Sequence, residues 1–249
     1  MVRHADREEV RRQREEIREK RKPLRQQRHP VPRMGSRGQP KESRATILEA
    51  AAREFAAHGI DGARIDAIAR EARVNKALLY YYFKDKETLY GAVLDRVFSG
   101  LKAAISTALD SNLPPREKVL AYAGAHFDYV AANPIYPRLM LRELMRSPHH
   151  SAQAEKVLRD YLVPTFNRVS EMLAEGIAQG EFRKVDPFQC VPSMVGVIVF
   201  YFTGASMRQR IMGFNPLTPE RIAERRVAVL DFISAALFAP KLKMQGARS

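Results

Sequence analysis

Between residues 41 and 238 the apolar residues recur at the spacing of an α-helix, and this pattern limits the fold more than any other feature. Ile47, Ala51 and Phe55, for example, are four residues apart and therefore share one helix face. The runs are separated by residues that end helices, such as Gly59 and the pair Asn133-Pro134. We find no alternating apolar runs joined by hairpin turns, which would indicate paired strands. The sequence predicts an all-α fold.

Turns, breakers and charge divide the chain into four expected parts. Residues 1–40 form a basic arm, residues 41–90 a small helical domain, residues 91–240 a larger helical domain, and residues 241–249 a tail. Within the larger domain the helical periodicity is clearest in five segments. These are Glu117–Ala132, Tyr136–Arg146, Ala152–Gln179, Pro187–Met212 and Pro219–Phe238.

The arm holds half of the chain's excess positive charge. The whole chain has 42 Lys and Arg against 28 Asp and Glu, a net charge of +14, while residues 1–40 have 13 against 6, a net of +7. Such an excess of positive charge favours a polyanionic partner. Two interpretations of the arm remain open, because a charged stretch with so few apolar residues is typical both of a disordered extension and of an arm that follows DNA phosphates.

Composition also argues against several classes of protein. A single cysteine, Cys190, rules out a disulfide scaffold. The apolar stretch Cys190–Ala205 is shorter than the roughly 20 residues that span a bilayer, and Met1–Lys22 lacks the apolar region of a secretory signal. His126 and the pair His149-His150 have no second ligand pair at helical spacing. We therefore expect a soluble cytoplasmic protein with no membrane partner, no metal and no cofactor.

Two short helical segments joined by a three-residue turn give the chain its most informative motif. The first carries Ile65, Ile68 and Ala72, and the second places Leu79 and Phe83 four residues apart, toward the first. Two short helices joined in this way describe a helix-turn-helix, whose second helix can enter the major groove of DNA. The turn ends at Asn75, whose side chain is a good cap for the second helix. Lys76 with Tyr80, and Ala77 with Tyr81, are predicted to face away from the core.

The stretch from Ile47 to Leu94 resembles the DNA-binding domain of the tetracycline-repressor (TetR) family of transcriptional regulators. The resemblance rests on Ile47-Leu48-Glu49-Ala50-Ala51, Phe55, Gly59, Ile68-Ala69 and, above all, Leu79-Tyr80-Tyr81-Tyr82-Phe83-Lys84-Asp85-Lys86-Glu87-Thr88-Leu89. This last block is highly specific. The stretch covers about a fifth of the chain, and the remainder resembles the family only in being helical.

The resemblance implies a role in DNA binding for seven residues. Asn75, Lys76, Ala77 and Tyr80 would face bases or the adjacent backbone, whereas Tyr81, Lys86 and Arg64 would contact phosphates. Two residues depart from the family's usual pattern. Arg64 stands where a Ser or Thr often caps a helix, and Arg73 replaces a common turn Gly, so a positive φ is expected to strain it.

An enzymatic interpretation has weaker support. Tyr80 and Lys84 spell the Tyr-x-x-x-Lys pair of short-chain dehydrogenases, but no glycine-rich turn between a strand and a helix precedes them. We therefore expect no catalytic residues and no enzyme.

The helices of the larger domain supply residues for a ligand pocket. Apolar walls with a few polar groups suit a small apolar or amphipathic effector, although the same residues could also form an ordinary core. The candidate pocket residues are His126, Phe127, Tyr136, Met140, Arg142, Phe166, Met172 and Phe200, with Glu143 as a further polar contact.

A nearly all-apolar helix at residues 190–205 is predicted to be buried on two sides. Together with the last helix it resembles the four-helix dimer interface of the TetR family. The interface residues expected for a homodimer are Val195, Val199, Phe202, Val227, Leu230, Ile233 and Leu237.

The resemblance as a whole implies a regulator that binds double-stranded operator DNA. It would be a repressor that a small molecule releases from its operator. The alternative is a non-catalytic architectural nucleic-acid-binding protein dominated by its basic arm.

Overall fold

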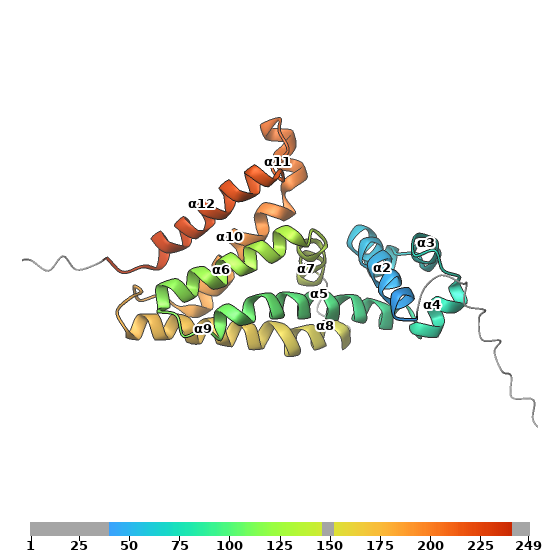
Figure 1. Cartoon of the computed structure of the whole chain (residues 1–249), viewed down its shortest axis with the longest axis horizontal. Coiled ribbons are helices and arrows are strands. Elements are labelled where there is room, and N and C mark those ends of the chain that lie inside the picture. Colours follow the sequence, from blue (N-terminus) through green and yellow to red (C-terminus); the bar gives the residue numbers. More distant parts are fainter. Residues whose placement is uncertain (1–39, 146–151, 241–249) are drawn as a thin grey trace, which may run out of the picture. The chain divides into compact units, whose positions relative to one another are not determined.

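The structure, a computed structural model, describes residues 40–145 and 152–240 (Figure 1). Every regular element in these two ranges is a helix, and one isolated antiparallel bridge within them joins Phe182 to Phe238. The predicted all-α fold is confirmed. The predicted arm, except for Pro40, lies outside the described residues, and so do His149-His150 and the predicted tail.

Three helices build the N-terminal unit: α2 (Pro40–Gly62), α3 (Ile65–Glu71) and α4 (Lys76–Tyr82). The residues with helical spacing meet in its core, where side chains from all three helices and from the start of α5 are almost fully buried. They include Ile47, Phe55, Ile68, Leu79, Phe83 and Tyr90. The rings of Phe55 and Tyr90 meet edge to face at 4.9 Å, which ties α2 to α5.

Helix α2 breaks near its end at Gly59, where the sequence predicts that the helix stops. The backbone there has φ 69° and ψ 176°, a conformation that glycine adopts at little cost. A last turn then continues to Gly62. Lys86 Nζ lies 3.2 Å from the carbonyl oxygen of Ala63 and 3.4 Å from that of Asp61, so its ammonium holds the end of this turn.

The turn between α3 and α4 has the geometry that its sequence predicts. Asn75 Oδ1 accepts a hydrogen bond from the Leu78 amide at 2.7 Å and caps α4. Arg73 has φ 56° and is the one non-glycine residue with a positive φ among the described residues. A side chain in this left-handed region costs about 1–2 kcal/mol, so Arg73 is a strained substitute for glycine.

The larger helical part consists of α5 (Lys86–Leu109), α6 (Pro115–Ala132), α7 (Ile135–Met145), α8 (Ala152–Val157), a π-helical turn (Leu158–Leu162), α9 (Val163–Ala178), α10 (Pro187–Thr203), α11 (Ala205–Met212) and α12 (Pro219–Leu237). Helix α5 begins where Asp85 caps it by accepting from the Thr88 amide at 2.7 Å, as predicted. It continues without a break through the expected domain boundary at residue 90.

Two of the predicted long helices are interrupted, and their sequences explain both breaks. The segment Ala152–Gln179 contains the π-helical turn just before Pro164, whose ring nitrogen has no hydrogen to donate to the preceding turn. The segment Pro187–Met212 bends by 64° at Gly204, where α10 gives way to α11. A pattern of apolar residues continues across both breaks and therefore does not reveal them.

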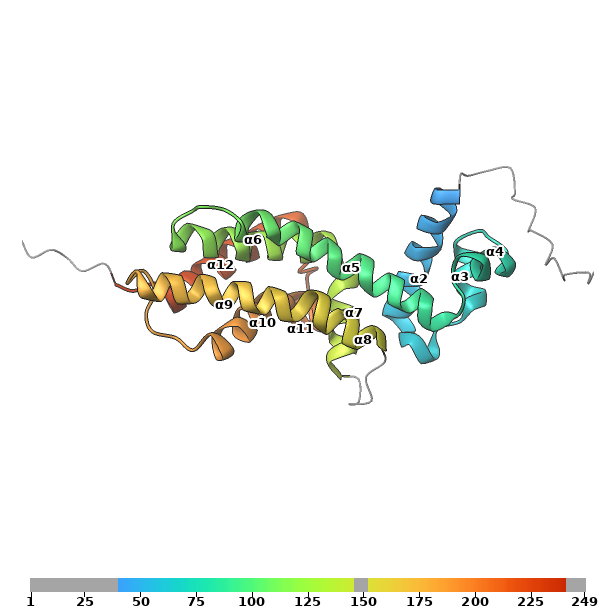
Figure 2. The same ribbon diagram turned by 90° about the horizontal axis from the view of Figure 1, so that it is seen from below.

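Helix α6 lies at the centre of the larger part and packs against α5, α9, α10 and α12. Helix α5 contacts both α2 and α6, and Figure 2 shows it extending from the N-terminal unit alongside α9. Helix α7 also contacts α2 as well as α10. Both α5 and α7 therefore link the N-terminal unit to the larger helical part.

Candidate DNA-binding face and ligand cavity

Helix α4 presents one face to the core and another to solvent. Leu79 is fully buried, whereas Lys76, Ala77, Tyr80 and Tyr81 are exposed, Tyr81 to 69%. The orientation follows from helical spacing, since residues four apart share a face. The structure therefore brings together on one helix four of the seven residues that the resemblance assigns to DNA.

The ammonium group of Lys76 has a partner in this structure. Its Nζ lies 2.5 Å from Asp66 Oδ1 of α3, and both side chains are more than half exposed. The hydrogen bond from Lys76 is the main reason that the pKa of Asp66 lies below its usual value. An exposed pair of this kind contributes little to folding, because water screens both charges. Lys76 can leave Asp66 at small cost.

The other predicted phosphate contacts lie at helix ends. Arg64 precedes α3 and is exposed, and its side chain makes no capping hydrogen bond. Its amide instead donates to Glu54 Oε1 at 3.0 Å. Lys86, at the start of α5, is half-buried because it bonds the end of α2. No local sequence pattern indicates this structural role for Lys86.

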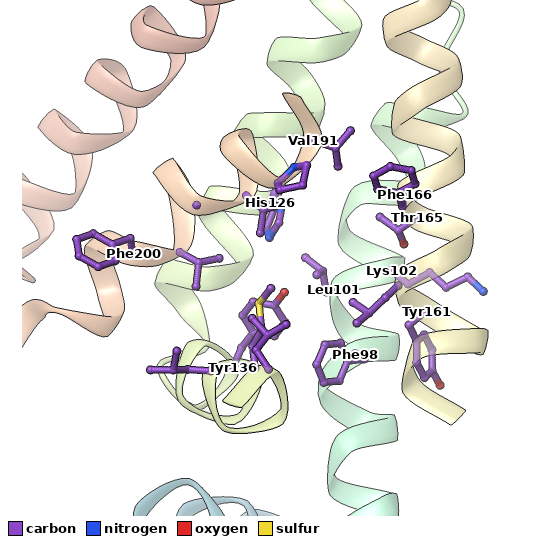
Figure 3. A pocket seen from close by; sticks show the side chains of 18 of the residues that line it. Phe98, Leu101, Lys102, His126, Tyr136, Tyr161, Thr165, Phe166, Val191 and Phe200 are labelled. Carbon is purple, nitrogen blue, oxygen red and sulfur yellow. The ribbon is translucent and has the colours of Figure 1, made fainter. Parts of the chain in front are cut away.

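A cavity of about 530 Å³ lies among α5, α6, α7, α9 and α10 (Figure 3). This volume is within the range of small-molecule sites. Five of the eight predicted pocket residues line it: His126, Tyr136, Met140, Phe166 and Phe200. The prediction missed several other wall residues, among them Phe98, Leu101, Tyr122, Tyr161 and Val191. Phe98 and Leu101 are three residues apart on α5, a spacing that could have identified them as one face.

Three predicted pocket residues do not line this cavity. Phe127 is fully buried and packs its ring against Phe202 at 5.3 Å, because one residue beyond His126 the helix has turned by about 100°. Met172 is buried in the core. Arg142 reaches α2 instead, and its guanidinium donates to the carbonyl oxygens of Ala56 at 3.2 Å and Ala57 at 2.6 Å.

Helix α7 therefore has two kinds of contact. Tyr136, Met140 and Leu144 belong to the cavity wall. Arg142 bonds α2 just before its break at Gly59, and Glu143 accepts a hydrogen bond from the Tyr90 hydroxyl of α5. One short helix thus joins the cavity to the framework of the N-terminal unit.

His126 is a deeply buried polar group of the cavity wall, with 3% of its surface exposed. Its Nδ1 lies 3.5 Å from the Tyr122 hydroxyl, and its Nε2 has no hydrogen-bond partner among the described residues. Burial lowers the pKa of His126 to about 4, so the ring is neutral at pH 7. The described residues hold no cluster of three or more potential metal ligands, at His126 or elsewhere.

The predicted dimer residues divide into two groups. Val199, Ile233 and Leu237 are at most 8% exposed within a single chain, and Val195 and Val199 line the cavity. The predicted place of Val199, Ile233 and Leu237 on an outer surface is corrected, since the buried side of each helix has the same apolar period as the outer one. Phe202 and Leu230 are half-buried, and Val227 is 69% exposed. Other large apolar residues exposed on α10, α11 and α12 are Phe188, Phe200, Met207, Ile211, Met212 and Phe232.

Within the described ranges, no single helix is both long and apolar enough to cross a membrane. Helices α10 and α11 meet the length and composition criteria only when taken together, and they are bent by 64°.

Two family profiles match most of the described chain. The profile for bacterial regulatory proteins of the tetR family matches residues 47–93, which contain α3 and α4. The profile for the tetracyclin repressor-like C-terminal domain matches residues 115–233, from α6 into α12. The first match ends within α5, and the second begins with α6, the helix that follows it.

The chain is also similar in sequence to individual transcriptional regulators. The HTH-type transcriptional repressor SCO4008 of Streptomyces coelicolor is 39% identical over 125 residues, which are 48% of this chain and 62% of that protein. The match thus spans less than two thirds of SCO4008. The HTH-type transcriptional repressor NicS of Pseudomonas putida is 26% identical over 58% of this chain and 68% of its own.

A solved structure extends the similarity to the larger helical part. The TetR family transcriptional regulator PfmR from Thermus thermophilus superposes with a TM-score of 0.59 and 26% identity, over 75% of this chain and 92% of PfmR. With the exposed α4 face, the two profiles and these relatives in agreement, the chain belongs to the TetR family of DNA-binding transcriptional regulators.

Proposed function

We propose that this protein is a homodimeric repressor that binds a specific operator and is released from it by a small molecule in the cavity. The observation that carries the proposal is the α4 face, with Lys76, Ala77, Tyr80 and Tyr81 exposed beside a capped helix N-terminus. The relatives SCO4008 and NicS, both named as repressors, support the sign of regulation. Such a repressor acts where bacterial DNA is, in the cytoplasm.

The α4 face would divide the work of recognition. Asn75, Lys76, Ala77 and Tyr80, at and after the helix start, would meet base edges or the adjacent backbone, since a helix in the major groove reads bases with its N-terminal residues. Tyr81 would bond a phosphate. Lys86 and Arg64 would bind further phosphates. To do so, Lys86 would exchange its hydrogen bond to the carbonyl oxygen of Ala63 for one to a phosphate oxygen.

The proposed dimer would use the outer surfaces of α10 and α12. Val227 and Phe232 of α12 are exposed to 69% and 59% in the single chain, and exposed apolar residues gathered on neighbouring helices are typical of protein interfaces. Two half-sites one DNA turn apart, roughly 34–36 Å, require two recognition helices held at a fixed spacing. A homodimer meets this requirement.

Helix α7 offers the route by which a ligand in the cavity would change operator affinity. A ligand that moves Tyr136 or Met140 would also move Arg142, and with it the α2 carbonyls that this guanidinium holds. Helix α5, which also has residues in both parts, would act alongside α7. The ligand can weaken operator binding only as far as its affinity differs between the two arrangements.

Selection of bound DNA from a random pool, followed by a salt titration, tests the DNA-binding function. The selected site and a scrambled site of equal length are compared at several salt concentrations. We expect the pool to converge on a two-fold symmetric site that binds about 10³-fold or more tightly than the scrambled one. A protein dominated by its basic arm would instead bind both sites with similar affinity and a steep salt dependence. That result would contradict the repressor function and favour an architectural nucleic-acid-binding protein.

A further inference from the structure

The cavity wall contains a deeply buried polar atom that the described residues leave unused. His126 Nε2 has no partner among them, and the ring stands in the cavity wall in Figure 3. Buried polar groups in folded proteins are nearly always hydrogen-bonded, and each exception calls for an explanation. A partner supplied by a bound molecule is one such explanation.

Most of the remaining wall is apolar, and two of its polar side chains are directed elsewhere. The Tyr161 hydroxyl donates a hydrogen bond to Asp95 Oδ1 at 2.6 Å, and Asp95 does not line the cavity. The Lys102 side chain is exposed, and Figure 3 shows its nitrogen directed away from the cavity. The wall also carries the hydroxyls of Tyr136 and Thr165, and Figure 3 shows Thr165 on the side opposite His126. The described residues that line the cavity include no Asp or Glu.

The groups that face His126 do not favour a charge inside the cavity. Tyr122 comes from the same helix, α6, and the ring of Tyr136, from α7, lies 6.3 Å from that of His126. Burial raises the pKa of both tyrosines above their usual value. Helix α10 contributes no titratable side chain to the wall, and α5 contributes only Lys102. A charged ligand group would lose its water without gaining an opposite charge.

We infer that the cavity binds a neutral, mainly apolar molecule whose single hydroxyl or carbonyl oxygen hydrogen-bonds to His126 Nε2, and that it discriminates against carboxylates and amines. The inference deepens the proposed function, because it names the chemical class of the effector. The binding step itself requires no DNA and is tested without it.

The contact between His126 and Tyr122 determines which oxygen fits. If the Tyr122 hydroxyl donates to Nδ1, then Nε2 carries the hydrogen and donates to a carbonyl or a hydroxyl. If Nδ1 donates to Tyr122, then Nε2 accepts and only a ligand hydroxyl can donate to it. An alcohol suits both arrangements and a ketone only the first, so their relative affinity reports the tautomer.

Isothermal titration of the full chain at pH 7.5 with four twelve-carbon probes tests this assignment. The probes are 1-dodecanol, 2-dodecanone, dodecanoate and dodecylammonium, each below its aggregation concentration. We expect dodecanol to bind at least about tenfold more tightly than the carboxylate and the ammonium, as expected when a buried charge has no partner. Equal or tighter binding of either charged probe, or no binding of any probe, would overturn the inference.

Three variants test whether His126 itself makes the contact with the ligand. His126→Phe keeps an aromatic ring but removes Nε2, so dodecanol affinity should fall about five- to tenfold, in line with one lost hydrogen bond. His58→Phe makes the same change at an exposed histidine that does not line the cavity, and should leave the affinity within about twofold. His126→Gln, which retains a polar group, should recover part of the loss and guards against a folding defect in the phenylalanine variant. Unchanged affinity in His126→Phe contradicts the assignment.

Operator binding is measured on the same samples, so the two ideas can fail separately. If dodecanol binds through His126 but the selected operator is unaffected, the ligand class stands and ligand-driven release fails. If the operator is bound specifically but no neutral probe binds, the DNA-binding function stands and the inferred ligand class fails.

Discussion

At the scale of single residues, Asp66 pairs with Lys76, a cation of the proposed DNA-binding face. Its carboxylate holds Lys76 Nζ at 2.5 Å and adds a negative charge close to the surface that would meet DNA phosphates. Asp66→Asn removes that charge and weakens the hold on Lys76. We predict that operator affinity rises about two- to tenfold, as an electrophoretic mobility-shift titration would measure. The matched control is Glu49→Gln, which alters the exposed Glu49–Arg96 pair between α2 and α5. An equal gain in both variants would indicate a net-charge effect and contradict the specific role of Asp66.

His126 should make folding stability depend on pH. Burial lowers the pKa of its ring from 6.5 to about 4, so the unfolded chain binds this proton more readily than the folded one. The unfolding free energy should therefore fall as the pH drops from about 6.5 to 4, by up to about 3 kcal/mol, and the effect should be absent above pH 7. Tyr122 and Tyr136, the neighbouring titratable groups, ionise outside this window.

Urea unfolding between pH 4 and 7.5 measures this dependence. His126→Phe should flatten the profile, whereas the exposed His58 serves as a control and His58→Gln should leave most of it intact. A histidine-to-phenylalanine variant with the same loss of stability on acidification as the original chain would show that other groups cause it.

At the scale of secondary-structure elements, α7 is the connection that matters for regulation. Arg142→Ala removes two hydrogen bonds to α2 but no cavity-lining group. We predict a loss of about 1–3 kcal/mol in unfolding free energy, since the part-buried carbonyl of Ala56 loses its partner, and a reduced effect of ligand on operator affinity. Ligand affinity itself should remain within about twofold, because the cavity wall is unchanged.

The control for this helix is Arg138→Ala, whose side chain is exposed on α7. Calorimetric ligand binding and operator titration, each with and without the other component, give the coupling for both variants. Full coupling in the Arg142 variant would exclude α7 as the route and leave α5.

The local sequence predicted the secondary-structure elements better than it predicted the contacts between them. The spacing of Ile47 and Phe55, the cap at Asn75 and the strained turn at Arg73 all depend on residues a few positions apart, and the structure confirms each. The bonds from Arg142 to α2 span 85 and 86 residues, and no local rule anticipates them. Ile233 was misplaced for a related reason, because apolar spacing identifies a buried face without saying which neighbour buries it.

The prediction of the cavity was incomplete for the same reason, because apolar spacing does not show which neighbour a residue faces. Periodicity and residue type suggested the aromatic and methionine residues of the middle helices, and five of the eight predicted residues do line the wall. The other three failed because neighbouring positions on a helix point in different directions. Val199 was assigned to a subunit interface because nothing in the sequence indicates how α10 is rotated against α6.

At the scale of the whole molecule, the outer face of α12 is expected to join two subunits. Phe232→Asp combined with Val227→Asp would place two carboxylates in the proposed interface, where charges without partners strongly disfavour association. We predict a monomer by analytical ultracentrifugation at micromolar concentration and at least about a hundredfold loss of operator affinity. The control is Leu113→Asp, which alters an exposed apolar residue between α5 and α6. A double variant that remains dimeric would move the interface elsewhere.

The most direct test of the whole account is the reciprocal effect of ligand and operator. A ligand that binds the cavity, found by thermal-shift screening, is titrated into the protein with and without the selected operator, and the operator is titrated with and without saturating ligand. The account predicts that the ligand weakens operator binding about 5- to 150-fold and that the operator weakens ligand binding by the same factor. If every ligand that fills the cavity leaves operator affinity unchanged, the protein is a DNA-binding dimer without a switch, and the central claim is wrong.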